Sequence, residues 1–250
     1  RPLPLGGVRL PILMYHKVDE VPAGVRHPGN YVRPARFAEQ LAALSAWGYA
    51  PVTLDDWVAY RRRGTRADGS PFPPRPLALT FDDGYASFAD VALPLLQRAG
   101  WSATVFVVSG QVGGTNAWDR DERQEPLLDA AALRALPPLG IGVGSHTRTH
   151  RPLARIPAGE AAAELAASRD ELEQLLGAPV TTLAYPFNNQ SPRVRRLARR
   201  AGYAAAVMGR GRVNGRLRTR LGLYRLKVDL DTTLDGLEAQ LERPTPLWPF

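Results

Sequence analysis

The sequence predicts an α/β fold in which helices cover a closed or nearly closed parallel barrel. Short apolar, β-prone segments alternate with amphipathic segments along the whole chain. Such alternation is typical of parallel strands joined by helices. Seven or eight of these units in 250 residues fit a barrel better than an open sheet, because barrels of this kind reach this length as one domain. We therefore expect a single domain over residues 1–250.

The expected strands are short runs rich in apolar and β-branched side chains. They lie at residues 9–18, 49–53, 76–81, 102–108, 141–145, 180–187, 203–208 and 223–230. A parallel barrel places its chemistry at the carboxyl ends of its strands. The polar residues that follow each strand are therefore the first candidates for a functional site.

The expected helices have apolar residues three and four positions apart. They lie at residues 35–48, 54–63, 86–100, 128–136, 157–177, 191–202 and 233–242. Thr53 is the expected N-cap of the second helix, and Gly100 and Gly177 follow two others as stop signals. Residues 64–76 are rich in proline and 109–126 in polar side chains, so both segments are expected to be loops.

The composition excludes several classes of protein. Apolar residues make up 44% and charged residues 22% of the chain, and there is no cysteine. Disulfides, thiol catalysis and cysteine-ligated zinc are therefore excluded, and no stretch approaches the roughly 18 apolar residues of a membrane span. The formal charge of +8 is compatible with nucleic-acid binding. However, the basic residues are scattered and no nucleic-acid motif accompanies them, so we expect no nucleic-acid partner.

Polar side chains gather where the expected strands end. Asp82 and Asp83 follow one strand, His146 follows another with His150 four residues further on, and His16 ends the first strand. Two imidazoles at this spacing would face the same way on a helical turn and share one divalent ion. Either aspartate can complete a two-histidine, one-carboxylate ligand set. The pattern therefore favours a metal site.

The adjacent acids in TFDDG admit two interpretations. A turn or helix cap is the ordinary use of a DDG sequence. Neighbouring carboxylates repel each other, and a cation removes this conflict by taking one of them as a ligand. The other acid is then free to accept the proton of an attacking water. The histidines further along the chain favour this second interpretation.

Three motifs in this order resemble the NodB-homology polysaccharide deacetylases, carbohydrate esterase family 4. They are TFDDG at 80–84, SHTRTH at 145–150 and AYPF at 184–187. The resemblance implies a distorted (β/α)7 barrel and removal of N- or O-acetyl groups from sugars, often from N-acetylglucosamine polymers. It also implies one divalent metal ion, with zinc favoured over cobalt, nickel, iron and manganese.

Carried over to this sequence, the resemblance gives roles to the residues at the strand ends. Asp82 becomes the general base and Asp83 the carboxylate ligand of the metal. His146 and His150 become its two histidine ligands. These four residues match the first two motifs, which together are highly specific.

The resemblance and the local sequence also suggest residues that contact the substrate. Pro186 and Phe187 match the groove-lining part of the third motif, and the backbone N–H of Phe187 would help hold the oxyanion. Tyr85 and Tyr185 lie beside the motifs. Trp118 is the best candidate for a sugar platform because its loop is polar and glycine-rich.

The sequence departs from the family pattern at three places, and one of them is Asn188, which stands where glycine is common. The third motif usually begins with an arginine that holds the catalytic base, and Ala184 stands there; Arg225 in the last strand is the expected replacement as partner of Asp82. Many members also supply a late histidine as general acid, but no histidine follows the second motif. Residues 13–18, LMYHKV, resemble the subgroup that deacetylates poly-N-acetylglucosamine and uses an early histidine, so His16 is the expected acid.

The sequence thus predicts a metal-dependent N-deacetylase of an amino-sugar polysaccharide. A biofilm exopolysaccharide such as poly-N-acetylglucosamine is the favoured substrate, with peptidoglycan or chitin oligomers as alternatives. A catalytically silent carbohydrate-binding module of the same fold is the alternative from another class. The substrate implies a bacterial protein that is secreted, periplasmic or on the cell surface, and we expect a monomer.

Overall fold

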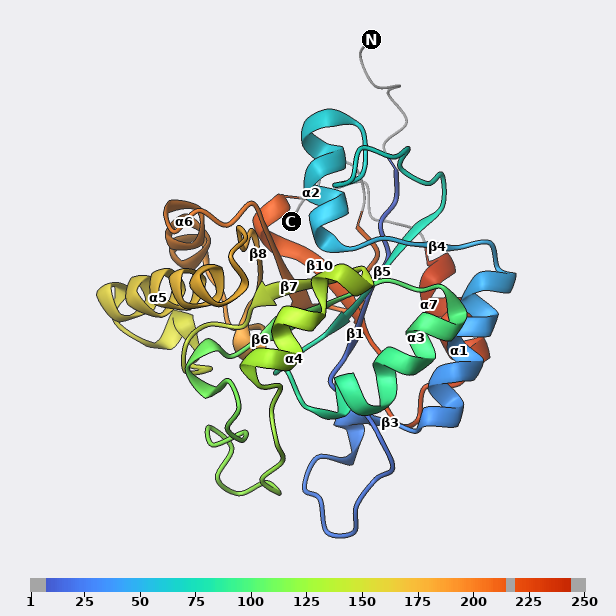
Figure 1. Cartoon of the computed structure of the whole chain (residues 1–250), viewed down its shortest axis with the longest axis horizontal. Helices are drawn as coiled ribbons and strands as arrows, with labels where there is room; N and C mark the ends of the chain where they lie inside the picture. Colours follow the sequence, from blue (N-terminus) through green and yellow to red (C-terminus); the bar gives the residue numbers. More distant parts are fainter. Residues whose placement is uncertain (1–7, 215–218, 244–250) are drawn as a thin grey trace.

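A closed ring of seven parallel strands forms the centre of the computed structural model, which describes residues 8–214 and 219–243 (Figure 1). The ring closes because the first strand pairs with the last strand on one side and with β5 on the other. In ring order its members are β1 (Ile12–Tyr15), β5 (Pro76–Phe81), β6 (Ala103–Val107), β7 (Ile141–Ser145), β8 (Thr182–Ala184), β9 (Ala205–Gly209) and β10 (Leu223–Lys227). The predicted (β/α)7 barrel is confirmed.

Among the described residues, three short strands lie outside the ring. The strand β4 (Ala50–Pro51) pairs with the start of β5. The strands β2 (Lys17–Val18) and β3 (Tyr31–Val32) pair with each other. Residues 19–30 connect β2 to β3 and form an excursion of the chain on the side of the barrel where the strands end (Figure 1).

Helices surround the ring within the described part of the chain. They are α1 (Pro34–Ala46), α2 (Leu54–Arg63), α3 (Leu93–Ala99), α4 (Ala130–Ala135), α5 (Ala158–Leu176), α6 (Pro192–Arg200) and α7 (Leu234–Glu242). Short 3-10 turns lie at Pro28–Asn30, Ser109–Gln111, Pro137–Leu139, Leu153–Arg155, Pro186–Asn188 and Arg220–Gly222. In Figure 1, α1, α3 and α7 cover one side of the barrel, and α5 and α6 the other.

Several helix ends follow from the expected capping chemistry. Thr53 caps α2 through a capping box, in which its hydroxyl accepts from the N–H of Asp56 and the Asp56 carboxylate accepts from the N–H of Thr53. This arrangement satisfies two N–H groups that have no partner within the helix. Gly100 and Gly177 end α3 and α5 with left-handed φ values of 68° and 65°. Glycine reaches this conformation without the steric cost that a Cβ atom imposes.

Two expected elements differ from the structure. The helix predicted over 86–100 begins with a π-helical turn at Phe88–Ala92 and becomes α-helical at Leu93. Pro94 lacks the N–H that an α-helix would use at that point, which weakens regular pairing there. The strand predicted over 180–187 ends at Ala184 because the chain turns at Pro186–Asn188. Strand boundaries elsewhere shift by a few residues.

The interior of the barrel is apolar at one end and polar at the other. One buried cluster joins inward side chains such as Ile12, Ala78 and Phe106 to Leu54 and Trp57 of α2. The helix α2 therefore plugs the amino-terminal end of the barrel. The polar side chains described below occupy the opposite end, where the strands finish.

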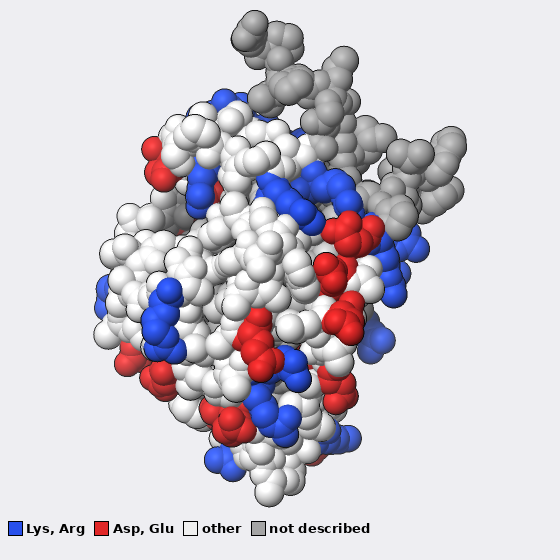
Figure 2. All heavy atoms as spheres, turned by 90° about the vertical axis from the view of Figure 1, so that its right-hand side faces the viewer, with Lys and Arg blue, Asp and Glu red and all other residues white. Residues whose placement is uncertain are grey.

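The charged side chains form a mixed surface on the face shown in Figure 2, where basic and acidic groups are interspersed. Among the residues that the structure describes, no helix has the length and apolar character needed to cross a membrane.

Candidate active site

Neighbouring strands bring the motif residues to the carboxyl end of the barrel. Tyr15 of β1 is paired with Phe81 of β5, and the N–H of Asp82 donates to the carbonyl of Tyr15 over 3.0 Å. Each strand then ends, so His16 and Asp82 follow side by side. Parallel pairing therefore explains why residues more than sixty positions apart reach one place.

Asp83, His146 and His150 converge on one point. Oδ1 of Asp83 lies 3.4 Å from Nε2 of His146 and 3.3 Å from Nε2 of His150. The three ligand atoms lie within 4.8 Å of one another, and all three residues are buried. Nδ1 of His146 donates to the carbonyl of Ala184 over 2.9 Å, which leaves Nε2 free to act as a ligand.

The donor set fits a divalent cation. Oδ1 of Asp83 is buried and accepts no hydrogen bond among the described residues. A buried carboxylate oxygen without a donor is costly, and two imidazole nitrogens face it. Two histidines and one carboxylate are a common ligand set of catalytic zinc sites. The three side chains therefore have the chemistry and the spacing of a metal centre.

The charges in this cluster shift the ionisation of its members. Burial raises the pKa of Asp83, but the contacts with both histidines outweigh it and hold that pKa well below its usual range. Burial lowers the pKa of His146, but Asp82 and Asp83 outweigh it and raise that pKa. For His150, burial prevails and lowers the pKa. Asp83 is therefore ionised at neutral pH, as a metal ligand must be.

Asp82 is held apart from this cluster by Arg225. Nη1 and Nη2 of Arg225 donate to the two carboxylate oxygens of Asp82 over 2.6 and 2.7 Å. Nη1 also donates to the Thr80 hydroxyl over 3.2 Å. Both ion-pair partners are buried, and Arg225 is only 1% exposed. The arginine expected to compensate for Ala184 thus forms a two-pronged ion pair with Asp82.

The ion pair decides the ionisation of Asp82. Burial raises its pKa, but Arg225 and His146 outweigh burial, and the net pKa is below the usual value. Asp82 is therefore a carboxylate at neutral pH, and the charge of Arg225 is the largest of the effects that lower its pKa.

Backbone strain is concentrated at the site. Among the described residues, the left-handed φ values outside glycine belong to Asp83, Thr147, His150, Phe187 and Asn188. All five fall in the three motifs or directly after them. Each such residue costs of order 1–3 kcal/mol and persists only where its surroundings hold it. The site is therefore built by contacts that override local backbone preference.

His146 and His150 lie on a loop, which corrects the expectation of a helical turn. The chain leaves β7 at Ser145 and has φ values of 66° at Thr147 and 60° at His150. Two left-handed residues within four positions do not continue a helix. The Thr147 hydroxyl accepts from the N–H of His150 over 3.2 Å, and this closed turn directs both Nε2 atoms towards Asp83.

His16 lies at the end of β1, partly exposed, with its Nδ1 buried and without a hydrogen-bond partner among the described residues. Burial lowers its pKa, and the charges of Asp83 and Asp82 only partly oppose this effect. The structure thus brings His16 close enough to both acids for their charges to act on it.

Two aromatic rings flank the His150 imidazole. Trp118 stacks on it with centroids 4.6 Å apart and an interplanar angle of 29°. Phe187 meets it edge-on, also at 4.6 Å, and is 64% exposed. Phe187 is therefore not a core residue, although phenylalanine side chains are most often buried. Of the expected substrate contacts, Trp118 and Phe187 are the ones that the structure places at the ligand cluster.

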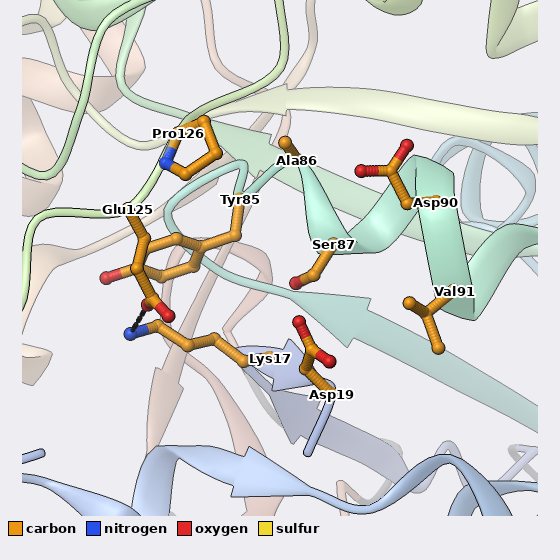
Figure 3. A pocket seen from close by; sticks show the side chains of 9 residues that line it. All are labelled: Lys17, Asp19, Tyr85, Ala86, Ser87, Asp90, Val91, Glu125 and Pro126. Atoms are coloured by element: carbon orange, nitrogen blue, oxygen red, sulfur yellow. Dashed lines mark ion pairs between the residues drawn. The ribbon is translucent and has the colours of Figure 1, made fainter. Parts of the chain in front are cut away.

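The other expected substrate contacts are buried. Tyr185 is 1% exposed, and its hydroxyl donates to the carbonyl of Leu221 over 3.1 Å. The Tyr185 side chain therefore faces the core. The turn that follows Ala184 exposes Phe187 instead. Pro186 is also buried. Tyr85 lies at 6% exposure against a cavity of about 110 Å³ that Lys17 and Glu125 also line (Figure 3).

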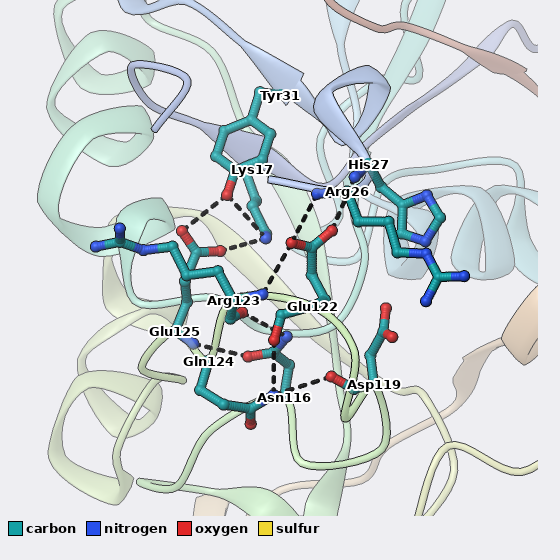
Figure 4. A network of polar contacts seen from close by, with 10 residues as sticks. All are labelled: Lys17, Arg26, His27, Tyr31, Asn116, Asp119, Glu122, Arg123, Gln124 and Glu125. Atoms are coloured by element: carbon teal, nitrogen blue, oxygen red, sulfur yellow. Dashed lines mark hydrogen bonds and ion pairs between the residues drawn. The ribbon is translucent and has the colours of Figure 1, made fainter. Parts of the chain in front are cut away.

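A network of polar contacts ties the loop of Trp118 to the excursion after β2 (Figure 4). Lys17 forms a buried ion pair with Glu125, and the Tyr31 hydroxyl donates to Glu125 over 2.8 Å. The Glu122 carboxylate accepts from the backbone N–H groups of residues 26, 27 and 123. The Asn116 side chain closes the loop on itself through residues 123 and 125. These contacts fix a segment that would otherwise be an exposed loop.

A family model for polysaccharide deacetylases matches residues 69–206, which is more than half of the chain. The chain belongs to the polysaccharide deacetylase family. The matched region contains both acids of the first motif and both histidines of the second. The family expected from the three motifs is confirmed, while His16 and Arg225 lie outside the matched region.

Individual relatives agree with this assignment. YxkH of Bacillus subtilis strain 168 is 23% identical over 236 residues, which cover 94% of this chain and 76% of YxkH. The poly-β-1,6-N-acetyl-D-glucosamine N-deacetylase of Escherichia coli K12 is 37% identical over 91 residues, 36% of this chain and 12% of that relative. The structure of Streptococcus pyogenes deacetylase PplD in complex with acetate matches with a TM-score of 0.77 at 23% identity, covering 95% of this chain and 100% of PplD. That likeness shows the fold.

Sequence reasoning missed several residues that surround the site in this deacetylase-family chain. Glu122 and Glu125 gave no signal because charged residues in polar loops are usually solvated, and Lys17 lies in the segment expected as the end of the first strand. Glu164 reads as an ordinary acid of an exposed helix, yet it is 8% exposed and contacts the histidine loop. The one available signal was the position of Lys17, directly after the expected acid His16.

Proposed function

We propose that the chain is a divalent-metal-dependent N-deacetylase of an amino-sugar polysaccharide, with poly-N-acetylglucosamine as the favoured substrate. The observation that carries this proposal is the separation of two neighbouring acids. Asp83 faces His146 and His150 in a buried triad, whereas Asp82 is paired with Arg225. A ligand and a free base side by side are the arrangement that hydrolysis at a metal requires.

In this proposal Asp83, His146 and His150 hold the metal ion. A divalent ion bound there would polarise the acetyl carbonyl and lower the pKa of a water towards about 7. Zinc is favoured, and cobalt, nickel, iron and manganese are the alternatives.

Asp82 serves as the general base and takes a proton from the attacking water. Its carboxylate is ionised because Arg225 offsets the cost of burial. The same ion pair fixes the direction of the carboxylate, since both of its oxygens are engaged. A base held in one orientation loses little entropy at the moment of reaction.

The remaining steps use Phe187 and His16. The backbone N–H of Phe187 stabilises the oxyanion that forms on the acetyl oxygen. His16 then gives a proton to the departing sugar amine. Because burial lowers the pKa of His16, its protonated form is a stronger acid than an exposed imidazolium and transfers its proton more readily.

The choice of substrate rests on likeness to known proteins. The Escherichia coli relative, 37% identical over 91 residues, is named for action on poly-β-1,6-N-acetyl-D-glucosamine, and a Staphylococcus epidermidis relative of the same name is 30% identical over 95 residues. Trp118 and Phe187 give such a polymer two rings to contact beside His150. A substrate of this kind places the protein outside the cytoplasm, secreted, periplasmic or on the cell surface. We further propose that residues 1–250 act as one domain and as a monomer.

Acetate release tests the proposal. The protein is incubated with oligomers of β-1,6-linked N-acetylglucosamine, chitin oligomers and peptidoglycan fragments, each with and without a chelator. We expect release from the β-1,6-linked oligomers, loss of release with chelator and recovery after a divalent ion is added back. Release that is insensitive to the chelator would refute the metal dependence, and preference for chitin or peptidoglycan would reassign the substrate.

A silent carbohydrate-binding module remains the competing function. The absence of the usual arginine at Ala184 was its main support, and the Arg225–Asp82 ion pair weakens that argument. A module that only binds sugar has no use for a buried carboxylate beside the ligand cluster. Binding of the oligomers without any acetate release would support the module.

A further inference from the structure

The loop that carries the two histidine ligands has a partner for each of its backbone N–H groups. The N–H of His146 donates to the carbonyl of Val107 over 2.7 Å, and that of Thr147 to the hydroxyl of Ser145 over 3.1 Å. The N–H of His150 donates to the hydroxyl of Thr147. The N–H groups between them, at positions 148 and 149, both donate to a side chain of α5.

That side chain is Glu164. Its Oε2 accepts from the N–H of Arg148 over 3.1 Å and from the N–H of Thr149 over 2.8 Å. Its Oε1 accepts from the hydroxyl of Thr149 over 2.5 Å. Glu164 is 8% exposed, so water competes little for these donors. A charged acceptor makes each of these bonds stronger than a neutral one would.

The same face of α5 makes a second contact with this region. Ser168, one helical turn after Glu164 and fully buried, shares a 2.7 Å hydrogen bond with the hydroxyl of Ser145. That hydroxyl in turn accepts from the N–H of Thr147. The helix α5 therefore holds the loop at both ends of the Thr147–Thr149 segment, between the two ligands.

We propose that Glu164 is a positioning residue of the metal site. The loop has left-handed residues at Thr147 and at His150, and strained backbone keeps its shape only when its surroundings determine it. Glu164 engages the two N–H groups between these strained positions. It thereby holds the Nε2 atoms of His146 and His150 at the spacing that Asp83 requires. This inference rests on the proposed metal site and names a residue that the motifs do not contain.

Metal affinity measures this role without any need for activity. Wild-type protein and Glu164→Ala are freed of metal, and zinc affinity is determined by competition with a chromophoric chelator. Partners that orient metal ligands are typically worth about 10–100-fold in affinity, so we expect Glu164→Ala to bind zinc about 10–100-fold more weakly. We expect Glu164→Gln to recover most of the affinity, since its amide oxygen can accept from both N–H groups while its NH2 donates to the Thr149 hydroxyl.

Two matched controls come from the same helix. Glu160 and Glu171 contact the Arg151 and Arg148 side chains of this region rather than backbone N–H groups. Glu160→Ala and Glu171→Ala should therefore keep wild-type zinc affinity. The increase in melting temperature on adding zinc provides a second readout, because the stabilisation of the fold by a ligand grows with the logarithm of its affinity at a fixed ligand concentration. It should shrink in Glu164→Ala and stay unchanged in the controls.

The outcomes separate this inference from the function on which it rests. Wild-type zinc affinity in Glu164→Ala, with or without a lower melting temperature, would overturn the positioning role and leave the metal site intact. Equal losses of zinc affinity in Glu164→Ala and Glu160→Ala would also overturn it. The loss would then come from any substitution on this face of α5 and not from the contacts of Glu164. Wild-type protein that takes up no divalent metal would overturn the metal site and the inference together.

Discussion

Replacing Arg225 by methionine tests how the proposed general base, Asp82, is held. Methionine fills much of the same volume but removes both prongs of the ion pair with Asp82. Removing one partner of a buried ion pair costs about 3–5 kcal/mol, because the remaining charge is left without compensation. Arg225 is 1% exposed and Asp82 is 3% exposed. Because water barely reaches either side chain, this cost of a buried ion pair applies to them without reduction. We expect a folded protein with a markedly lower free energy of unfolding.

The pH dependence of this loss has a definite sign. The pKa of Asp82 is lowered in the native state, so the ion pair contributes stability above about pH 4, which is lost as the pH falls through the lower native pKa. Without Arg225, the pKa of Asp82 rises because burial is no longer offset. The stability deficit of the variant should therefore be largest at neutral pH and narrow as the pH falls through the raised pKa of Asp82 in the variant.

Activity should change in a matching way. The acid limb of the pH profile of kcat/KM should move to higher pH in Arg225→Met, since the base is then protonated over a wider range. At neutral pH we expect a loss of about 10²-fold, the size expected for a displaced catalytic group. Arg225→Lys is the matched variant, because it keeps the charge but not the fork, and its acid limb should stay near that of the wild type.

The account would be refuted by an unchanged acid limb and unchanged turnover in Arg225→Met. Loss of bound metal in this variant would also count against it, since Arg225 contacts Asp82 and Thr80 rather than the ligand cluster. Metal content is therefore measured on every sample before the kinetics.

Three further predictions concern the rim of the site. His16→Asn should lower kcat for N-acetyl substrates by about 10²–10⁴-fold but hardly affect hydrolysis of an activated aryl acetate, whose leaving group needs no proton; equal losses would contradict its role as acid. Trp118→Ala should raise KM by up to roughly tenfold, the worth of one aromatic contact, with kcat less affected; a change in kcat alone would argue against a substrate platform. Asn188→Ala should be less stable than Asn188→Gly by about 1 kcal/mol, because only glycine tolerates the left-handed φ of 55° without strain; urea denaturation of the two variants decides this.

The ligand cluster was predictable because parallel strands end together. Asp83 follows β5 and His146 follows β7, with β6 between them in the ring. Because all strands of a parallel barrel end on the same side, both residues lie at the carboxyl end of the barrel. The pairing of Arg225 with Asp82 was predicted because Ala184 stands where the motif usually has an arginine. Its absence indicated that another arginine had to pair with Asp82. Both inferences used strand order, which alternating hydrophobicity reveals well.

The contacts around the cluster were not predictable in the same way. The Tyr31–Glu125 hydrogen bond joins residues 94 positions apart, one in the short strand β3 and the other in an irregular loop, and no periodic pattern connects such residues. The exposure of Phe187 and the burial of Tyr185 depend on a single turn with a left-handed φ at Phe187. Glu164 holds backbone N–H groups whose direction is set by strained residues. These features depend on loop geometry, which local sequence preference describes poorly.

The most direct test of the account is the position of the metal itself. Crystals grown with zinc or cobalt and measured at the absorption edge would locate the ion by its anomalous signal. The account predicts one ion per chain, bound by Asp83, His146 and His150 at about 2.0–2.2 Å, with Asp82 still paired to Arg225. An ion bound by Asp82 instead, or no ion between the two histidines, would contradict the account.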